Sequence, residues 1–316
     1  MKRILNRLAQ SILIMFLVSI LCFALTKAAP GDPVMTYVEP NMSEEYIEQL
    51  REDLGLNKPV VEQYLIWLKN ILQGNFGNSL MNKRPVLTQI LERLPATILL
   101  MGSSLVLSVL LAIPIGLYTG KHKNKFWDKL TSMLSFVGIS IPTFWFGILL
   151  IYLFSVTLGW LPSIGMRTDG VNSFWDLIRH LIMPCAVLTF QNVAQYTRYI
   201  RSSTITELSS DYVTVQRAYG MSEAGILFRH ILKNAILPMI TVLGMSLQSV
   251  VSGAIITEQV FAWPGTGQLA VTAVTTFDYP LIMGITMFTA LLIVIGNLLA
   301  DICYSIVDPR IRIAKN

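Results

Sequence analysis

Six long stretches of the sequence lack Asp, Glu, Lys and Arg altogether, and this segregation of charge limits the possible folds most strongly. They cover residues 8–26, 94–120, 130–166, 181–197, 234–257 and 279–300. A helix needs about 20 mostly apolar residues to cross the hydrocarbon core of a bilayer, and a charge at its centre costs on the order of 3 kcal/mol or more. The pattern therefore predicts an all-α, polytopic membrane protein with six transmembrane helices. The 130–166 stretch holds one span and a loop, and Tyr199 and Ile200 complete the short 181–197 span.

The overall composition agrees with a membrane protein. Apolar residues form 53% of the chain and charged residues 14%, against about a quarter charged in soluble domains. If the six stretches were buried helices of a soluble protein, too little polar chain would remain to cover the core. A second alternative is a cleaved signal peptide, because Lys2, Arg3 and Arg7 precede the first apolar run and Ala28-Ala29 follow it. The length of that run and the further spans favour a retained helix.

Lys and Arg near the ends of spans predict the orientation in the membrane. The N-terminus, the loops after the second and fourth spans, and the C-terminal tail are rich in basic residues: Lys2, Arg3, Arg7, Lys121, Lys123, Lys125, Lys129, Arg198, Arg201, Arg217, Arg229, Lys233, Arg310, Arg312 and Lys315. The 258–280 loop has none, and the 155–180 loop has only Arg167 and Arg179. We therefore expect both termini in the cytoplasm. The net charge of +5 follows from this topology and indicates no nucleic-acid partner.

The sequence predicts no catalytic, metal or nucleotide site. It contains no Gly-x-x-x-x-Gly-Lys-Ser/Thr motif for binding ATP and no Ser/His/Asp or paired-carboxylate arrangement. The three cysteines fall within spans and the three histidines are scattered over loops: Cys22, Cys185, Cys303, His122, His180 and His230. Neither set predicts a disulfide framework or a metal site.

The 27–93 segment is too long to be a simple connector. It opens with the turn signal Ala29-Pro30-Gly31-Asp32-Pro33. Ser43 then caps a short helix that ends before Gly55, and Pro59 opens a second helix that ends at Gly74. The apolar residues of the two helices lie at helical spacing: Tyr46, Ile47, Leu50, Leu54, Tyr64, Trp67, Leu68 and Leu72. These helices either pack into a small external subdomain or lie on the membrane surface.

Two other segments contain breaks. Residues 261–267 read Phe-Ala-Trp-Pro-Gly-Thr-Gly, which cannot continue a helix. We expect a turn there and a short external or partly inserted helix before the last span. In the third span, Pro142 predicts a kink and Trp145 a packing role.

The loop between the fourth and fifth spans carries most of the functional information. Residues 211–238 predict two short helices broken at Gly220, with Ser222 as the cap of the second. One side of the second helix is mostly apolar, with Ile226, Leu227, His230, Ile231 and Asn234 at helical spacing. Such a broken helix suits docking into a groove of a partner protein, and it equally suits a surface helix in the lipid headgroups.

This loop resembles the cytoplasmic EAA loop of ABC importer permeases, in the version of the dipeptide and oligopeptide branch, which also includes nickel importers. The matching residues are Tyr212, Val213, Arg217, Ala218, Gly220, His230, Asn234 and Pro238. Further motifs of that branch match along nearly the whole chain: residues 29–33, Gln63-Tyr64 with Trp67-Leu68, residues 74–79, 261–267 and 278–280, and Asp308-Pro309-Arg310. Thr214, Val215 and Gln216 replace the glutamate and alanines that name the loop, Leu232-Lys233 replaces a common Leu-Pro, and Phe277 stands where an Arg is frequent.

The resemblance implies the first permease subunit of a bacterial inner-membrane importer with the type I permease fold. Its expected parts are a first helix (1–26), an extracytoplasmic segment (27–93), a five-helix core (94–308) with the coupling loop 198–234, and a tail (309–316). It implies four kinds of partner: the lipid bilayer, a homologous second permease, two cytoplasmic ATPases that use ATP and Mg, and an external substrate-binding protein. The chain itself would be non-catalytic and bind no cofactor. The residues expected to couple it to an ATPase are Tyr212, Arg217, Ala218, Gly220, Ser222, Glu223, His230 and Asn234. Of these, Arg217 and Glu223 are candidates for polar contacts and Gly220 for the turn.

Uncharged polar residues within the spans are candidates for the substrate path: Gln191, Asn192, Gln195, Gln248 and Asn297. Their amides suit transient hydrogen bonds to a peptide, but hydrogen bonds between helices are the favoured alternative. Peptides and nickel or another metal chelate are both compatible with the branch. An ion-coupled secondary transporter, from another class, would need an intramembrane acid or His and inverted repeats, and the sequence contains neither.

Overall fold

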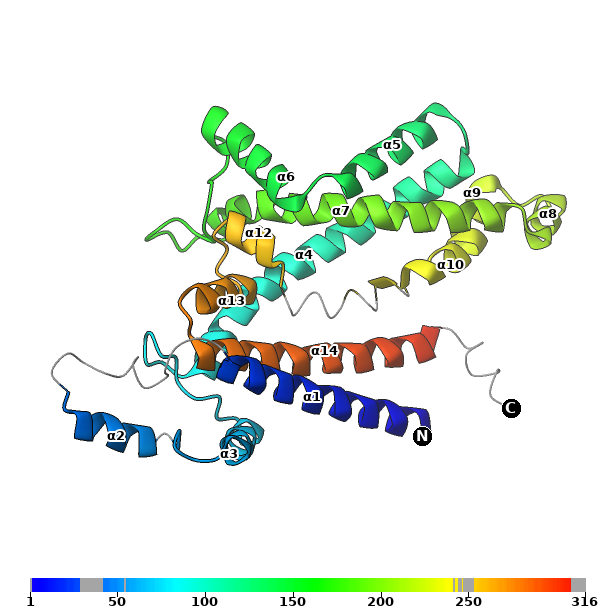
Figure 1. Cartoon of the computed structure of the whole chain (residues 1–316). Coiled ribbons are helices and arrows are strands. Elements are labelled where there is room, and N and C mark those ends of the chain that lie inside the picture. Colours follow the sequence, from blue (N-terminus) through cyan, green and yellow to red (C-terminus); the bar gives the residue numbers. More distant parts are fainter. Residues whose placement is uncertain are drawn as a thin grey trace. The chain divides into compact units, whose positions relative to one another are not determined.

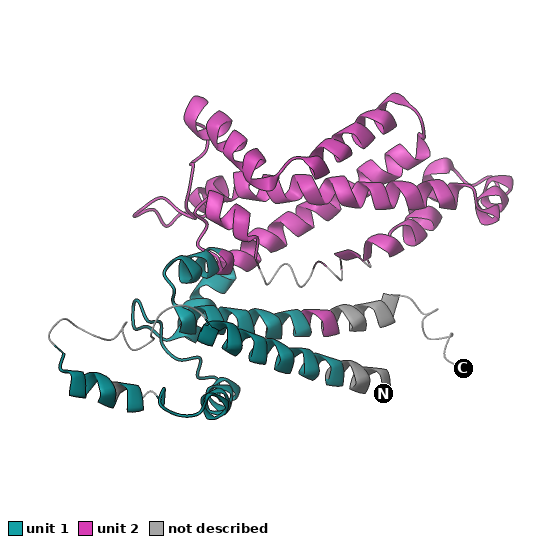
Figure 2. Ribbon diagram, in the orientation of Figure 1, with its two compact units in different colours: residues 1–95, 268–295 teal, residues 96–267, 296–316 magenta. Residues whose placement is uncertain are grey.

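The computed structural model describes residues 2–28, 42–53, 55–240, 242–243, 246 and 253–307 (Figure 1). This part of the chain is helical and contains no β-strand beyond an isolated bridge between Asn78 and Pro85. It divides into two compact units (Figure 2). Unit 1 comprises residues 1–95 and 268–295, and unit 2 comprises residues 96–267 and 296–316.

Four helices in the described residues are long and apolar enough to cross a membrane: α1 (Lys2–Ala28), α4 (Val86–Lys121), α7 (Phe174–Leu208) and α14 (Tyr279–Val307). A fifth span results if α5 (Phe126–Ser140) and the pair α6 (Thr143–Leu150) and η2 (Ile151–Thr157) are one broken helix, bent by 103°. The bend follows Pro142, as predicted, while the Trp145 side chain is exposed rather than packed. The predicted 234–257 span lies largely outside the described residues.

The helices are longer than the charge-free stretches from which they were predicted. For the fourth span, expected over 181–197, α7 runs from Phe174 to Leu208 and includes Arg179, Arg198 and Arg201. The second, expected from residue 94, begins at Val86 and includes Glu92 and Arg93. The absence of charge marks only the part of a helix that lies in hydrocarbon, and a helix continues through charged residues once they reach the interface.

In unit 1, the two predicted helices of the 27–93 segment are confirmed. They are α2 (Glu44–Asp53), where the Tyr46 N–H donates to Ser43 Oγ at 3.3 Å, and α3 (Val60–Leu72), which begins after Pro59. Tyr64 and Trp67 of α3 pack against Phe23 of α1, with ring centroids 5.5 and 5.7 Å from the Phe23 ring. The 29–33 motif and Leu54 lie outside the described residues. The segment therefore packs against the first span through α3.

A second cluster in unit 1 joins the start of α4 to α13 (Thr266–Thr275) and α14. The short helix expected before the last span is thus α13. Asp278, buried between α13 and α14, accepts hydrogen bonds from the Ser79 hydroxyl and from the Leu80 N–H at 3.1 Å. The loop before α4 and the turn before α14 are in this way held together.

In unit 2, glycines allow α4 and α7 to approach closely. A Cβ added at Gly116 would lie 2.7 Å from Cβ of Ile200, and one added at Gly120 would lie 2.6 Å from Cβ of Thr204. Neither distance is possible without a shift of the helices, so small residues set this contact. At the same end of α7, Arg201 forms an ion pair with Asp128 of α5, with Nη2 2.8 Å from Oδ2.

The 253–267 segment of unit 2 folds around a buried acid. Glu258 of α12 (Ile255–Val260) is fully buried and accepts a hydrogen bond from the Thr97 hydroxyl at 3.0 Å. A Cβ added at Gly253 or Gly267 would lie 2.8 or 2.9 Å from a Glu258 carboxylate oxygen, and one at Gly265 would be closer still. The neighbouring Trp263, also fully buried, donates from Nε1 to the Ala96 carbonyl at 2.8 Å. The predicted turn is therefore packed rather than exposed.

Candidate coupling site

The coupling loop has the broken helix that the sequence predicts. Helix α8 (Asp211–Ala218) ends just before Gly220, whose φ of +76° places it in the left-handed region. A glycine adopts this conformation without the steric cost that other residues meet. Ser222 then caps the next helical stretch, with its Oγ accepting from the Gly225 N–H at 3.2 Å. That stretch consists of α9 (Glu223–Gly225), the π-helical segment η3 (Ile226–Ile231) and α10 (Leu232–Ala235).

The apolar side of this stretch is buried against the chain's own helices. Its buried side chains pack with buried residues of α4, α7 and α8 in one cluster: Ala112, Leu117, Tyr196, Ile200, Val213, Ile226, Leu227, Ile231 and Ala235. Between α8 and α10, three large apolar side chains remain exposed, Val215 at 49%, Tyr219 at 83% and Phe228 at 61%. A movement of the exposed side would therefore be passed through close packing to α4 and α7.

Arg217 and Glu223 pair with each other across the Gly220 turn. Arg217 Nε lies 2.7 Å from Glu223 Oε1, and its Nη2 lies 3.3 Å from Oε2. The hydrogen bond from Arg217 holds the pKa of the Glu223 carboxyl below its ordinary value, and the same bond raises the pKa of Arg217. Both side chains are exposed, so solvent screens the pair. The two residues expected to meet a partner thus close the turn within this chain.

Glu207, which the sequence analysis did not select, joins three segments of the loop. Its Oε2 accepts a hydrogen bond from the Tyr212 hydroxyl at 2.6 Å and another from Asn234 Nδ2 at 2.9 Å. Glu207 lies near the end of α7, Tyr212 in α8 and Asn234 in α10. Burial and then the bond to Glu207 raise the pKa of Tyr212 to about 12. We call these three residues the Glu207 cluster. An available signal was that Glu207 is the one acidic residue between Arg198 and Ser210.

The remaining coupling candidates do not join either group. Ala218 is the exposed last residue of α8. His230 is half-buried, and its Nε2 is buried without a hydrogen-bond partner among the described residues. The predicted residues therefore fall into two groups, one at the turn and one at Glu207, and Ala218 and His230 belong to neither.

The polar candidates within the spans do not form one site. Gln191 Nε2 donates weakly to the Ile141 carbonyl at 3.5 Å, which joins α7 to the end of α5. Asn192 is half-buried, Gln195 and Asn297 are exposed, and Gln248 lies outside the described residues. Among the four that are described, no hydrogen bond joins one to another. The Gln191 contact is of the interhelical kind.

Two family models match this chain. The model described as binding-protein-dependent transport system inner membrane component matches residues 112–313, and the model of the corresponding N-terminal region matches residues 1–101. The chain is 44% identical to the oligopeptide transport system permease protein AppB of Bacillus subtilis over 311 residues, 98% of each chain.

Two further relatives are similar along their length. A Brucella suis protein named as a peptide permease is 39% identical over 313 residues. The probable peptide ABC transporter permease protein y4tP of Sinorhizobium fredii is 38% identical over 311 residues. In both cases 98% of each chain is covered. The resemblance seen in the motifs is confirmed, and the chain belongs to the family of binding-protein-dependent transport system inner membrane components.

Proposed function

We propose that the chain is a permease subunit of an ATP-driven peptide importer and forms half of its path through a bacterial inner membrane. The observation that carries the proposal is similarity to peptide permeases over 98% of the chain. The similar region contains the coupling loop. We further propose six spans, with both termini in the cytoplasm. The basic residues around the coupling loop and in the tail support this orientation.

In this proposal the coupling loop is the contact with an ATPase. Its exposed Val215, Tyr219 and Phe228 supply apolar surface for a groove on the partner, while its buried side is fixed to α4 and α7. The Arg217–Glu223 pair and the Glu207 cluster keep the broken helix rigid. When the ATPases close on ATP, the loop moves as one body and turns the attached helices, which opens the path to the other side.

The other subunits complete the transporter. A homologous permease forms the second half of the path, two ATPases bind ATP and Mg, and an external binding protein delivers the peptide. This chain is non-catalytic. Asn192, Gln195, Gln248 and Asn297 are proposed as groups that touch the peptide in passage, while Gln191 serves packing.

Co-purification from the native host tests this proposal. A tagged chain should bring down a second permease and ATPases identified by mass spectrometry, and Gly220→Pro should lose the ATPases. Gly170→Pro is the matched control, because Gly170 has nearly the same φ, +77° against +76°, and neither glycine has an atom within 4 Å of an added Cβ. A chain that purifies alone, or a Gly220→Pro variant that keeps its ATPases, contradicts the proposed coupling. The chain reconstituted alone should show no uptake.

A further inference from the structure

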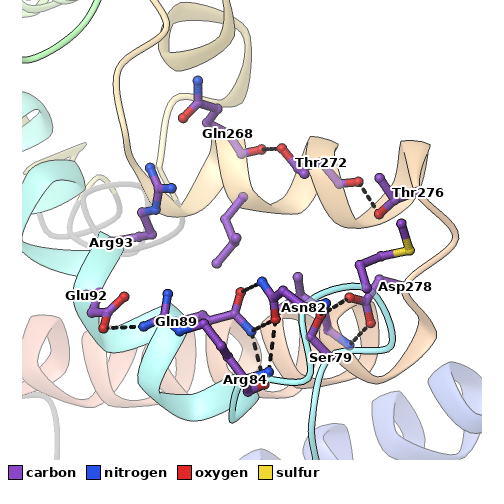
Figure 3. Close-up of a pocket in the computed structure, with 13 residues that line it drawn as sticks. Ser79, Asn82, Arg84, Gln89, Glu92, Arg93, Gln268, Thr272, Thr276 and Asp278 are labelled. Carbon is purple, nitrogen blue, oxygen red and sulfur yellow. Dashed lines mark hydrogen bonds and ion pairs between the residues drawn. The ribbon is translucent and has the colours of Figure 1, made fainter. Parts of the chain in front are cut away.

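Unit 1 contains a polar cavity of about 210 Å³ between the loop before α4, the first turns of α4, α13 and the start of α14 (Figure 3). Ten of its thirteen lining residues have charged, amide or hydroxyl side chains. In the proposed orientation this end of unit 1 faces the outside of the cell. The cavity is separate from the coupling loop, which belongs to unit 2.

Nearly all charged groups of the cavity are already paired. Arg84 forms an ion pair with Glu92 at 2.6 Å. Asp278 is buried and accepts from the Ser79 hydroxyl, the Leu80 N–H at 3.1 Å and the Leu281 N–H at 3.3 Å. These groups have little capacity left for a ligand.

Arg93 is the exception. Its side chain is half-buried and lines the cavity, and no hydrogen bond or ion pair joins its guanidinium to any of the described residues. Figure 3 places Arg93 and Asp278 at opposite ends of the cavity, and the other acid of the lining, Glu92, is paired with Arg84. A guanidinium offers several N–H donors in a planar arrangement that matches a carboxylate. An anionic group is therefore the natural partner.

The wall formed by α13 adds a second feature. The hydroxyls of Thr272 and Thr276 donate to the carbonyls of Gln268, at 3.1 Å, and of Thr272, at 2.8 Å. Their oxygens consequently remain available as acceptors. One end of the cavity thus offers a cation, and a neighbouring wall offers acceptors for N–H groups.

We propose that this cavity binds the α-carboxylate end of a peptide as it enters the permease, with Arg93 pairing with the carboxylate. The inference rests on the proposed peptide transport. The carboxylate and the backbone N–H are common to peptides of any sequence, so such a site recognises peptides without selecting side chains. A docking protein would instead need a broad surface, about 800 Å² on each partner, whereas a small concave cavity suits the end of a chain.

The test uses the complete complex with its binding protein in proteoliposomes and compares uptake of radiolabelled tri-alanine with that of tri-alanine amide, which lacks the carboxylate. The binding protein contributes equally to the ratio of the two rates for every variant. Arg93→Gln should lower the preference for tri-alanine about tenfold or more, since a hydrogen-bonded charge pair is lost, and Arg93→Lys should retain part of it. Lys58→Gln, which removes an exposed cation of unit 1 outside the cavity, should leave the ratio unchanged.

A binding measurement on the wild-type complex tests the inference without depending on whether a variant folds. The complex without binding protein, in nanodiscs, should bind tri-alanine about tenfold more tightly than its amide. Equal binding of the two, or an unchanged uptake ratio in Arg93→Gln, overturns the inference. An unchanged ratio with weaker docking of the binding protein would assign the cavity to docking and overturn it as well. A wild-type complex that transports neither peptide would instead contradict the proposed function.

Discussion

In the coupling loop an ion pair closes the turn and large apolar side chains are exposed, whereas in the polar cavity one cation has no hydrogen-bond or ion-pair partner among the residues that the structure describes. Arg217 and Glu223 pair with each other while Tyr219 and Phe228 face solvent. In the cavity, Arg84 pairs with Glu92 and Asp278 accepts three hydrogen bonds, whereas Arg93 has no such partner in the described part of the chain. Exposed apolar area suits a partner that stays bound, because its burial is stabilising in proportion to area. A single unpaired charge suits a small ligand that binds and leaves.

The largest loss of peptide uptake is expected from substitution of Glu207. In Glu207→Ala, Tyr212 and Asn234 lose a shared acceptor, so the helices of the coupling loop should no longer move together. We expect peptide uptake by the reconstituted complex to fall about tenfold or more, with ATP hydrolysis less affected. Glu62→Ala, which removes an exposed acid paired with Lys58, is the control. Normal uptake in Glu207→Ala would show that the cluster does not transmit movement.

The exposed aromatic side chain of Phe228 tests the proposed contact between the coupling loop and an ATPase. Phe228→Ala should weaken ATPase binding to the permease by about tenfold, as truncation of a central interface aromatic does. Phe174→Ala at the start of α7, outside the coupling loop, is matched in exposure, 67% against 61%, and should leave the affinity unchanged. A titration of detergent-solubilised permease with ATPase measures both. Equal losses would mean that exposure alone, and not position in the loop, determines the effect.

The close contact of α4 and α7 beneath the loop can be tested by adding one carbon atom. Gly120→Ala should destabilise the complex by about 1–3 kcal/mol, because the new Cβ collides with Thr204. Gly102→Ala is in the same helix with nothing within 4 Å of the added Cβ, and we expect no loss there. Thermal unfolding of the two variants gives the comparison. Identical melting temperatures would show that the two helices separate at little cost.

The smallest expected effect is the pH dependence of the Arg217–Glu223 pair at the turn. Arg217 lowers the pKa of Glu223, so the pair stabilises the turn fully above the ordinary carboxyl pKa and ceases to do so as pH falls through the lowered value. In Arg217→Gln the Glu223 carboxyl should titrate at a higher pH, which NMR of labelled glutamate can measure. Because both groups are exposed, the overall stability near neutral pH should hardly change. A Glu223 titration identical in both proteins would mean that the pair does not form.

The features that could be predicted from the sequence are those that neighbouring residues along the chain determine. The turn at Gly220, the cap at Ser222 and the helix start at Pro59 each follow from local backbone preferences. The Glu207 cluster and the Arg217–Glu223 pair depend on how segments fold back on one another, which periodicity does not reveal. Arg93 lies within α4 beyond the charge-free stretch, so it was read only as a span boundary. The 234–257 span stays a prediction, because it lies largely outside the described residues.

The three glycines around Glu258 have a consequence for how this sequence can evolve. The Glu258 carboxylate occupies the volume where side chains at positions 253, 265 and 267 would extend. A larger residue cannot replace any one of these glycines while Glu258 remains. Loss of the Glu258 side chain would leave a cavity that one added alanine methyl group would fill only in part. Natural variants of the 253–267 segment should therefore change at these four positions together or not at all.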